Sequence, residues 1–179
     1  LNTHHHQDHV GGNLKLKAQT GATVYAPKKE KDLISGVDLF VTEGSSLHLL
    51  KNEVEVIETP GHTLGSICYW FKKDKILFVG DTLFFLGCGR LFEGTATQMY
   101  DSLQKIKKIP CDTLVYCAHE YTLKNCEFAL SVTPENIRLR KFYEDIKSHP
   151  SEPTIPFLLE KDLELNPFLN SERKDVGDS

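Results

Sequence analysis

Short runs of alternating or unbroken apolar residues predict several strands along the chain. At 53–59, Val and Ile partly alternate with charged residues, and the other apolar runs are only a few residues long. Such lengths and patterns are typical of strands rather than helices. The polar residues at 72–74 separate two runs and predict a hairpin. We therefore expect strands at 22–26, 53–59, 66–71, 75–79 and 114–117.

Helical patterns occupy other parts of the chain. Met99, Leu103 and Ile106 recur at spacings of four and three, which is the period of a helix face, and a proline follows them. Gly21 is placed to end an earlier helix. Thr133 is the expected N-cap of a later one, with the following proline at the first helical position. We expect helices at 13–20, around 99–106, at 122–131 and at 134–147.

The order of these elements predicts the domain organisation. Strands alternate with helices as far as residue 131, whereas the remaining residues have helical or irregular patterns. Within the latter, 148–156 is a polar, proline-bearing stretch. We expect an α/β domain over 1–131 that binds metal, and a small α-helical region over 132–179 that contributes to substrate binding.

Composition excludes several classes of protein. The chain has 179 residues, of which 40% are hydrophobic and 26% charged, with a net charge of -4. These values are typical of a globular domain, and the charge does not favour nucleic acid as a ligand. The apolar runs are far shorter than the about 20 residues that cross a bilayer. Five cysteines without a C-x-x-C pair predict reduced thiols rather than a disulfide framework.

The opening stretch from Thr3 to His9, T-H-H-H-Q-D-H, has the residues of a metal site. His4 and His6 are two positions apart, so an extended chain would place both on one side. Asp8 and His9 could then reach a second ion. Imidazole and carboxylate groups are ligands for zinc, iron(II) and manganese. A remnant of an expression tag is the alternative, but a tag would not continue into D-H-V-G-G-N.

Three further polar residues follow predicted strands. His62 stands in T-P-G-H-T after the strand at 53–59, Asp81 directly follows the apolar run that ends at Gly80, and His119 follows the strand at 114–117. Each residue alone is typical of an ordinary core or turn position. Because metal ligands converge from separate elements, the three together predict a metal site at one edge of the sheet.

These motifs resemble the metallo-β-lactamase superfamily, and within it the glyoxalase II, or hydroxyacylglutathione hydrolase, branch. The opening motif points to the superfamily. The stretch G-D-T-L-F...G-C-G-R-x-F-E-G-T at 80–95, H-E-Y at 119–121 and N-P-F-L at 166–169 point to the branch. The resemblance implies an αββα sandwich with a small C-terminal helical region.

The resemblance also implies the site residues. His4, His6 and His62 would hold one divalent ion, Asp8, His9 and His119 a second, and Asp81 would bridge them, so that Asp8 and Asp81 take part directly in catalysis. A hydroxide shared by the two ions would be the nucleophile. Zinc is the expected metal, with iron or manganese as the alternatives that the same ligands accept.

The substrate that the resemblance implies is S-D-lactoylglutathione, hydrolysed to glutathione and D-lactate in methylglyoxal detoxification. A small-molecule thioester is thus the expected partner, and we expect a monomer in the cytoplasm, with mitochondria as the alternative. Arg90 commonly corresponds to a lysine in the family, and Phe92 to a tyrosine. The expected substrate-binding residues are Arg90, Leu91, Phe92, His119, Glu120 and Tyr121.

The chain departs from the family pattern at both ends. Family members have several strands before the opening motif, where this chain has only Leu1 and Asn2, and a last helix with an Arg-x-x-Lys pair after N-P-F-L. The charged residues at 172–175 have a different spacing and are typical of a solvated tail. We therefore expect a sandwich that lacks its N-terminal strands and, taken alone, binds metal poorly and aggregates.

The residues alone leave other functions open. A persulfide dioxygenase of the same superfamily would bind one iron through His4, His62 and Asp81. A non-catalytic remnant domain would keep the motif without a completed site. A β-lactamase is disfavoured because Asp81 stands where many have cysteine, and a nuclease is disfavoured by the acidic net charge.

Overall fold

A six-stranded mixed sheet forms the centre of the molecule in the computed structural model, which describes residues 1–173 and 176. The strand order is β10-β9-β6-β5-β4-β3, with β6 and β9 parallel and the other neighbours antiparallel. The strands are β3 (Ser46–Leu49), β4 (Asn52–Glu58), β5 (Ile67–Phe71), β6 (Ile76–Gly80), β9 (Leu114–Cys117) and β10 (Phe157–Leu158).

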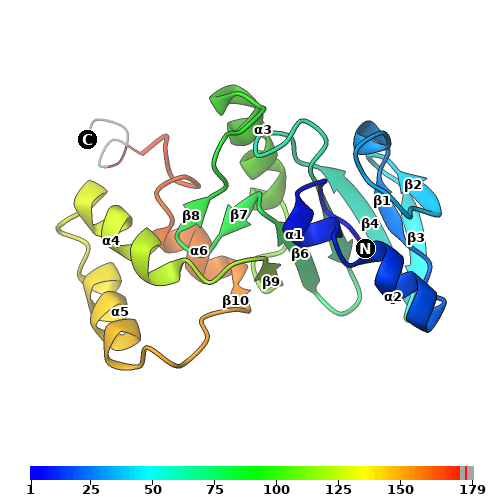
Figure 1. Cartoon of the computed structure of the whole chain (residues 1–179). Helices are drawn as coiled ribbons and strands as arrows, with labels where there is room; N and C mark the ends of the chain where they lie inside the picture. The colour runs from blue at the N-terminus through cyan, green and yellow to red at the C-terminus, as the bar shows by residue number, and fades with distance from the viewer. Residues whose placement is uncertain (174–175, 177–179) are drawn as a thin grey trace.

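Two small ribbons and seven helical segments surround this sheet in the described residues. The first ribbon joins β1 (Tyr25–Pro27) to β2 (Leu39–Val41), and the second joins β7 (Leu83–Phe84) to β8 (Gly87–Cys88). The helical segments are α1 (Gln7–Val10), α2 (Asn13–Thr20), η1 (Lys28–Glu30), α3 (Ala96–Lys107), α4 (Thr122–Val132), α5 (Ile137–Ser148) and α6 (Leu159–Leu165). Helix α2 lies at one end of the molecule, α4 and α5 lie at the other, and α1 lies between them (Figure 1).

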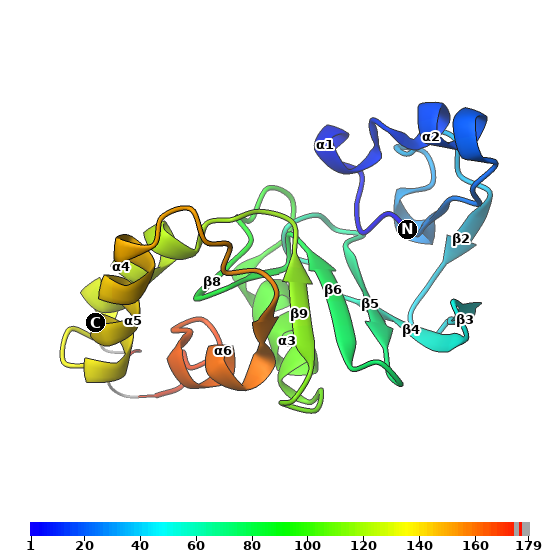
Figure 2. The ribbon, with the colours of Figure 1, turned by 90° about the horizontal axis from the view of Figure 1, so that it is seen from below.

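Alternation along the central strands sends side chains into two separate cores. Tyr69 is buried on one face of β5, whereas Cys68, its neighbour in sequence, is buried on the other with Leu77. Helix α3 covers this second face (Figure 2) and adds Leu103 to its core. Phe157 from the C-terminal region completes the same core. The predicted α/β fold is therefore confirmed, and the C-terminal region packs against the sheet as part of one structure.

Most predicted elements form close to their expected bounds. The strands expected from 53 to 117 correspond to β4, β5, β6 and β9, and β5 and β6 form the expected hairpin. Helix α2 ends at Gly21, which has a left-handed φ of 67° as its C-cap position requires. The strand expected at 22–26 forms only from Tyr25, because Val24 is held by the Asp38 carboxylate, which accepts from its N–H at 2.9 Å.

The predicted start of the helix at 134 is wrong. Helix α5 begins at Ile137, and its N-cap is Asn136, whose side chain accepts a hydrogen bond from the Leu139 N–H at 3.0 Å. Thr133 instead closes the preceding helix, since its hydroxyl donates to the Ala129 carbonyl at 3.0 Å. The cap moves because an asparagine three residues later competes for the same role.

The sheet topology decides where the chemistry-bearing residues meet. Because β4 and β6 are both antiparallel to β5, and β6 is parallel to β9, the strands β4, β6 and β9 run in one direction. Their C-terminal ends therefore lie along one edge of the sheet. His62, Asp81 and His119 follow these ends in sequence.

None of the helices within residues 1–173 and 176 has both the length and the apolar character of a bilayer-crossing segment. All five cysteines are free, as expected. Of the charged residues at 172–175, Lys174 and Asp175 lie outside the described residues.

Candidate metal centre

The opening loop is fixed to the sheet by hydrogen bonds and not by a strand of its own. The Ile67 N–H donates to the Thr3 carbonyl at 2.9 Å at the start of β5. The Asn2 N–H donates to the Tyr25 carbonyl, and the Tyr69 hydroxyl donates to the Asn2 carbonyl, both at 2.9 Å. These bonds bring the loop to the edge of the sheet where β4, β6 and β9 end.

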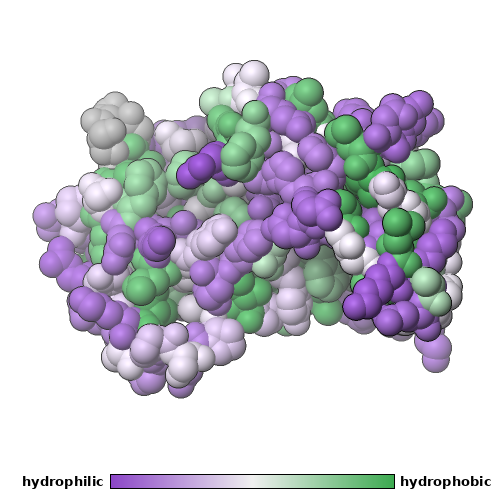
Figure 3. All heavy atoms as spheres, in the orientation of Figure 1, coloured by the Kyte–Doolittle hydropathy of each residue, from purple (hydrophilic) through white to green (hydrophobic). Residues whose placement is uncertain are grey.

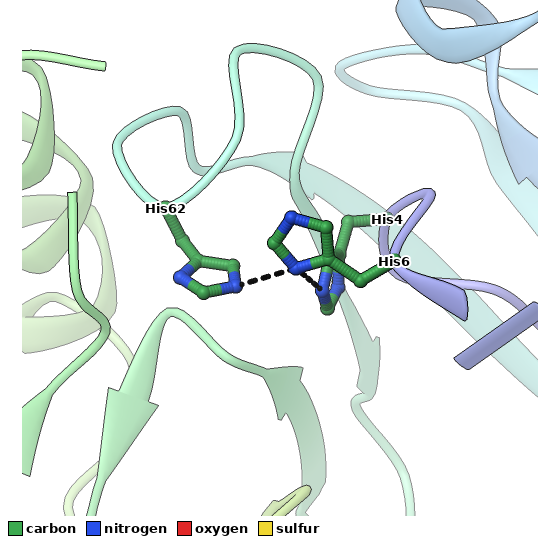
Figure 4. A group of neighbouring side chains, drawn as sticks. All are labelled: His4, His6 and His62. Carbon is green, nitrogen blue, oxygen red and sulfur yellow. Dashed lines mark hydrogen bonds between the residues drawn. The ribbon is translucent and has the colours of Figure 1, made fainter. Parts of the chain in front are cut away.

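His4, His6 and His62 form the first group of predicted ligands. His6 Nδ1 lies 3.1 Å from His4 Nε2 and 3.0 Å from His62 Nε2. The three rings point toward one another from two separate loops, one before α1 and one after β4 (Figure 4). A cluster of three imidazole nitrogens at such distances is typical of ligands that share one ion.

The outer nitrogens of this group have partners that set the orientation of the rings. His62 Nδ1 donates to the Arg90 carbonyl at 2.8 Å, which leaves Nε2 facing the cluster. His4 Nδ1 lies 3.2 Å from the Thr3 hydroxyl. Partners of this kind fix the tautomer of a metal-ligating histidine.

Asp8, His9 and His119 form the second group. The Asp8 carboxylate lies 3.4 Å from His9 Nε2 and 3.3 Å from His119 Nε2. Asp8 and His9 lie on α1, around which the surface is hydrophilic (Figure 3), whereas His119 follows β9. The short helix turns the chain so that residues directly after the first group reach a second position.

Asp81 lies between the two groups. Its carboxylate is 3.5 Å from His62 Nε2 in the first group. In the second group it is 3.2 Å from His9 Nε2 and 3.5 Å from His119 Nε2. One side chain thus contacts both groups, which is the position that a bridging ligand would occupy.

Two glycines make room for Asp81. A Cβ atom on Gly80, which has a φ of 52°, would lie 2.4 Å from the Thr3 hydroxyl. A Cβ on Gly89 would lie 1.8 Å from the carbonyl oxygen of Asp81. The sharp turn after β6 and the close return of the G-C-G segment therefore both depend on glycine.

The charges of the site suit metal ligands. Burial lowers the pKa of His4 to about 3, and burial together with the nearby His62 also lowers the pKa of His6, so both rings are neutral at pH 7. Burial opposes the charge on Asp81, but His9 outweighs it and lowers the pKa of the carboxyl. His9 differs, because Asp81 and Asp8 outweigh burial and raise its pKa, so a metal ion would have to displace the proton that this ring favours. Neutral imidazoles and ionised carboxylates are the forms that bind metal.

Two buried atoms of the cluster make no hydrogen bond to any described residue. They are His9 Nε2 and Asp81 Oδ1, which lie 3.2 Å apart without hydrogen-bond geometry. Leaving such atoms unsatisfied is costly, whereas a divalent ion would satisfy both. Together with the set of imidazole and carboxylate donors, these atoms show that the residues present fit metal ions.

Two exposed aromatic rings flank the cluster on its two sides. Phe92 lies edge-on to His6 and His62, with ring centroids 5.5 Å and 5.3 Å apart, and the Arg90 guanidinium lies 5.7 Å from the Phe92 centroid. On the other side Tyr121 stacks on His119 at 5.2 Å. These residues border the site from two different segments.

The other expected substrate residues are placed differently. The Glu120 carboxylate accepts hydrogen bonds from the Thr154 N–H at 2.9 Å and from the Thr154 hydroxyl at 2.6 Å, so it anchors a loop. Leu91 lines a cavity of about 620 Å³ together with Arg90, Met99 and Phe168. Neither side chain is among those that contact the histidine cluster.

Sequence reasoning missed the residues that support the ligands. Asn13 and Thr3 belong to the opening motif but carry no metal-binding group, and Glu30 lies far from every motif. The one sequence signal for any of these supporting residues was the continuation of the motif into G-G-N, whose last residue is Asn13. The structure brings all seven predicted ligands together and adds these supports around them.

Comparison with known proteins places the chain in a family. The family model of the metallo-beta-lactamase superfamily matches residues 1–119, and that of the hydroxyacylglutathione hydrolase C-terminus matches residues 120–179. A hydroxyacylglutathione hydrolase of Rhodospirillum rubrum is 48% identical over 181 residues, which cover 100% of this chain and 71% of the relative.

Solved structures agree with this placement. BLEG-1 B3 metallo-beta-lactamase has a TM-score of 0.68 at 25% identity, over 93% of this chain and 74% of that one. A protein solved in a di-iron-bound form has a TM-score of 0.54 at 26% identity, over 65% of this chain and 67% of that one. The chain has the metallo-β-lactamase fold and belongs to the hydroxyacylglutathione hydrolase family.

Proposed function

We propose that this enzyme hydrolyses S-D-lactoylglutathione to glutathione and D-lactate at a site of two divalent metal ions. The observation that carries the proposal is the position of Asp81, whose carboxylate lies within 3.5 Å of His62 in one ligand group and of His119 in the other. The relative from Rhodospirillum rubrum is named for this class of reaction, and one structural neighbour binds two irons.

The two groups of side chains have distinct roles in this proposal. His4, His6 and His62 would hold one ion, Asp8, His9 and His119 the other, and Asp81 both. When bound, such a pair of ions acidifies a water molecule and polarises the carbonyl that it attacks. The negative charges of Asp8 and Asp81 would balance part of the charge of the ions.

The chemistry of a thioester suits the residues around the cluster. Water adds to the thioester carbonyl carbon, the C–S bond breaks, and the acid and the thiol leave without any change of oxidation state. A thiol with a pKa of about 8.5 departs as thiolate without a strong general acid. The site therefore needs no further acidic group for the leaving sulfur.

In this proposal Arg90, Phe92 and Tyr121 bind the glutathione part. Phe92 is 60% exposed and Tyr121 is 47% exposed, although both contact histidines of the cluster. Their rings offer apolar contact on the two sides of a bound thioester. The Arg90 guanidinium is suited to a glutathione carboxylate, since it can donate two parallel hydrogen bonds.

Thiol release from S-D-lactoylglutathione, followed with a thiol reagent, tests the reaction, and metal analysis of the same samples tests the centre. The departures at the two ends of the chain predict poor metal binding, but the predicted ligands lie together in this chain. We therefore expect turnover that depends on metal and about two ions per chain. Asp81→Ala should lower metal content and abolish turnover together, whereas Asp32→Ala, on an exposed residue outside the cluster, should change neither. Retention of both ions by Asp81→Ala would contradict the bridging role.

The same samples separate the proposal from its rivals. One bound iron with oxygen consumption, and no thiol release from the thioester, would favour the persulfide dioxygenase. Metal binding without either activity would favour a non-catalytic domain. Each result excludes the hydrolase by a different measurement.

A further inference from the structure

We propose that His5 is a positioning residue that joins three segments around the metal centre by contacting two carboxylates at once. The inference rests on the proposed two-ion centre, because it concerns the support of the His4, His6 and His62 group. His5 lies between His4 and His6 in the sequence, but its ring contacts a different set of residues from theirs.

The two nitrogens of His5 face two glutamates from separate segments. Nδ1 lies 3.2 Å from the Glu30 carboxylate without hydrogen-bond geometry, and Nε2 lies 3.2 Å from the Glu93 carboxylate. Glu30 belongs to η1 and Glu93 to the segment after Phe92. One small ring thus connects the opening loop to two segments that are distant from it in sequence.

Glu30 is fixed in the protein and connects His5 to the loop of His62. Its side chain is only 3% exposed, and its Oε1 accepts a hydrogen bond from the Thr63 hydroxyl at 2.5 Å. Gly65 packs against it so closely that a Cβ there would lie 2.3 Å from the Glu30 side chain. Since Thr63 directly follows His62, the position of Glu30 determines the position of this ligand loop.

Glu93 makes the second connection. Its Oε2 accepts from the Leu64 N–H at 2.9 Å, on the same loop as His62. Backbone bonds reinforce the contact, since the Phe92 N–H donates to the His62 carbonyl at 3.3 Å and the Gly94 N–H to the Gly61 carbonyl at 3.1 Å. Glu93 therefore ties together the loop of His62 and the segment that carries Phe92.

His5 completes this arrangement by linking the opening loop to both glutamates. His4 and His6 come from the opening loop, and His62 comes from the loop that Glu30 and Glu93 hold. Without His5, the two loops that form the first ligand group lose the side-chain link between their supports. Partners outside the ligand set commonly change metal affinity about 10- to 100-fold in this way. The second group, Asp8, His9 and His119, does not contact the two glutamates by any described ion pair.

The inference is tested by competing Zn²⁺ from the whole chain with a chromophoric chelator, alongside thioester turnover. We expect the wild type to lose two ions in two steps. His5→Ala should weaken one step by about 10- to 100-fold and leave the other within about threefold. His149→Ala is the matched control, since His149 also faces a carboxylate, that of Asp145, but is exposed on the C-terminal side of α5.

Conservative variants separate positioning from loss of folding. His5→Gln can still face one carboxylate and should recover part of the lost affinity. Glu93→Gln keeps an acceptor for the Leu64 N–H, so it should fold normally and weaken the same step by less than His5→Ala. His5→Ala and Glu93→Gln break the same link between His5 and Glu93. A variant that carries both changes should therefore weaken that step no more than His5→Ala alone.

Three results would overturn the inference. Equal weakening of both steps in His5→Ala would show a general loss of structure, and unchanged steps would show that the contacts have no role. A third Zn²⁺ in the wild type that His5→Ala loses would make the cluster a metal site in its own right. Absence of thioester turnover with these zinc steps intact would instead contradict the proposed function.

Discussion

Asn2 and Asn13 exchange two side-chain hydrogen bonds across the base of the opening loop. Asn2 Nδ2 donates to Asn13 Oδ1 at 3.1 Å, and Asn13 Nδ2 donates to Asn2 Oδ1 at 2.9 Å. Asn2 also donates to the His9 carbonyl at 3.0 Å. The pair therefore closes the loop that carries four of the seven predicted ligands, with one partner on each side of the loop.

Loss of this pair should weaken both folding and metal binding. Asn13→Ala leaves the buried side-chain oxygen of Asn2 without its donor, which costs about 1–3 kcal/mol of unfolding free energy. We expect urea unfolding at lower concentration and lower affinity for Zn²⁺. Asn170→Ala also removes an amide with two hydrogen bonds, but in the C-terminal region, so it should lower stability alone. Wild-type zinc affinity in Asn13→Ala would contradict this role of the pair.

Gly89→Ala should disrupt the metal centre more than its small size suggests. The new Cβ would lie 1.8 Å from the Asp81 carbonyl, and the backbone must move to relieve the clash, which displaces Asp81. We expect loss of at least one bound ion and of turnover. The control is Gly21→Ala, where the Cβ meets no atom within 4 Å and only the left-handed backbone is strained, at a cost of about 1 kcal/mol. If both variants keep the same metal content, the account of Gly89 is wrong.

Arg90→Met should separate substrate binding from catalysis. Loss of a charge-assisted hydrogen bond to a glutathione carboxylate costs about 1.5–3 kcal/mol, which corresponds to about a 10- to 100-fold rise in KM. The kcat and the zinc content should change little, because only the Arg90 carbonyl contacts His62 and the backbone is kept. Arg138→Met, on an exposed arginine paired with Glu164, is the control. An unchanged KM would remove Arg90 from the substrate site.

Asp162→Asn should flatten the pH dependence of stability. Burial raises the pKa of Asp162 from 3.8 to about 7, against the hydrogen bond from the Leu86 N–H. Between these values the folded chain binds a proton that the unfolded chain has released, so unfolding free energy falls as pH rises. The slope from this group reaches about 1.4 kcal/mol per pH unit at most.

The difference between the two proteins isolates this effect from that of the other titrating groups. Urea unfolding at several pH values from 4 to 7 should show a smaller fall in Asp162→Asn than in the wild type. Equal slopes would mean that Asp162 is ionised throughout the range.

The sequence predicted the strands and helices near the site because their signals are local. The run from Ile76 to Gly80 and the helix ended by Gly21 depend on periodicity and a single capping residue. The N-cap of α5 could not be placed from the sequence, since Thr133 and Asn136 are both suitable N-cap residues. The hydrogen bond from the Thr133 hydroxyl to the Ala129 carbonyl decides between them. Local patterns do not report such competition.

The side chains predicted as ligands could be picked out from the sequence, but the residues that support them could not. Each ligand has a type and spacing that the motif makes visible, and the common direction of β4, β6 and β9 brings the ligands together. His5 and Glu93 also lie within the motifs, yet only the fold reveals that His5 contacts both Glu93 and Glu30. Long-range contacts of this kind depend on how loops from different strands meet.

The most direct test of the account is the rate of thiol release from S-D-lactoylglutathione as metal is added back to the metal-free chain. With Asp81 between two ligand groups, we expect activity to rise steeply with the second equivalent of Zn²⁺ and to level off at about two ions per chain. Full activity at one equivalent, or no thiol release with both ions bound, would contradict the two-ion hydrolase.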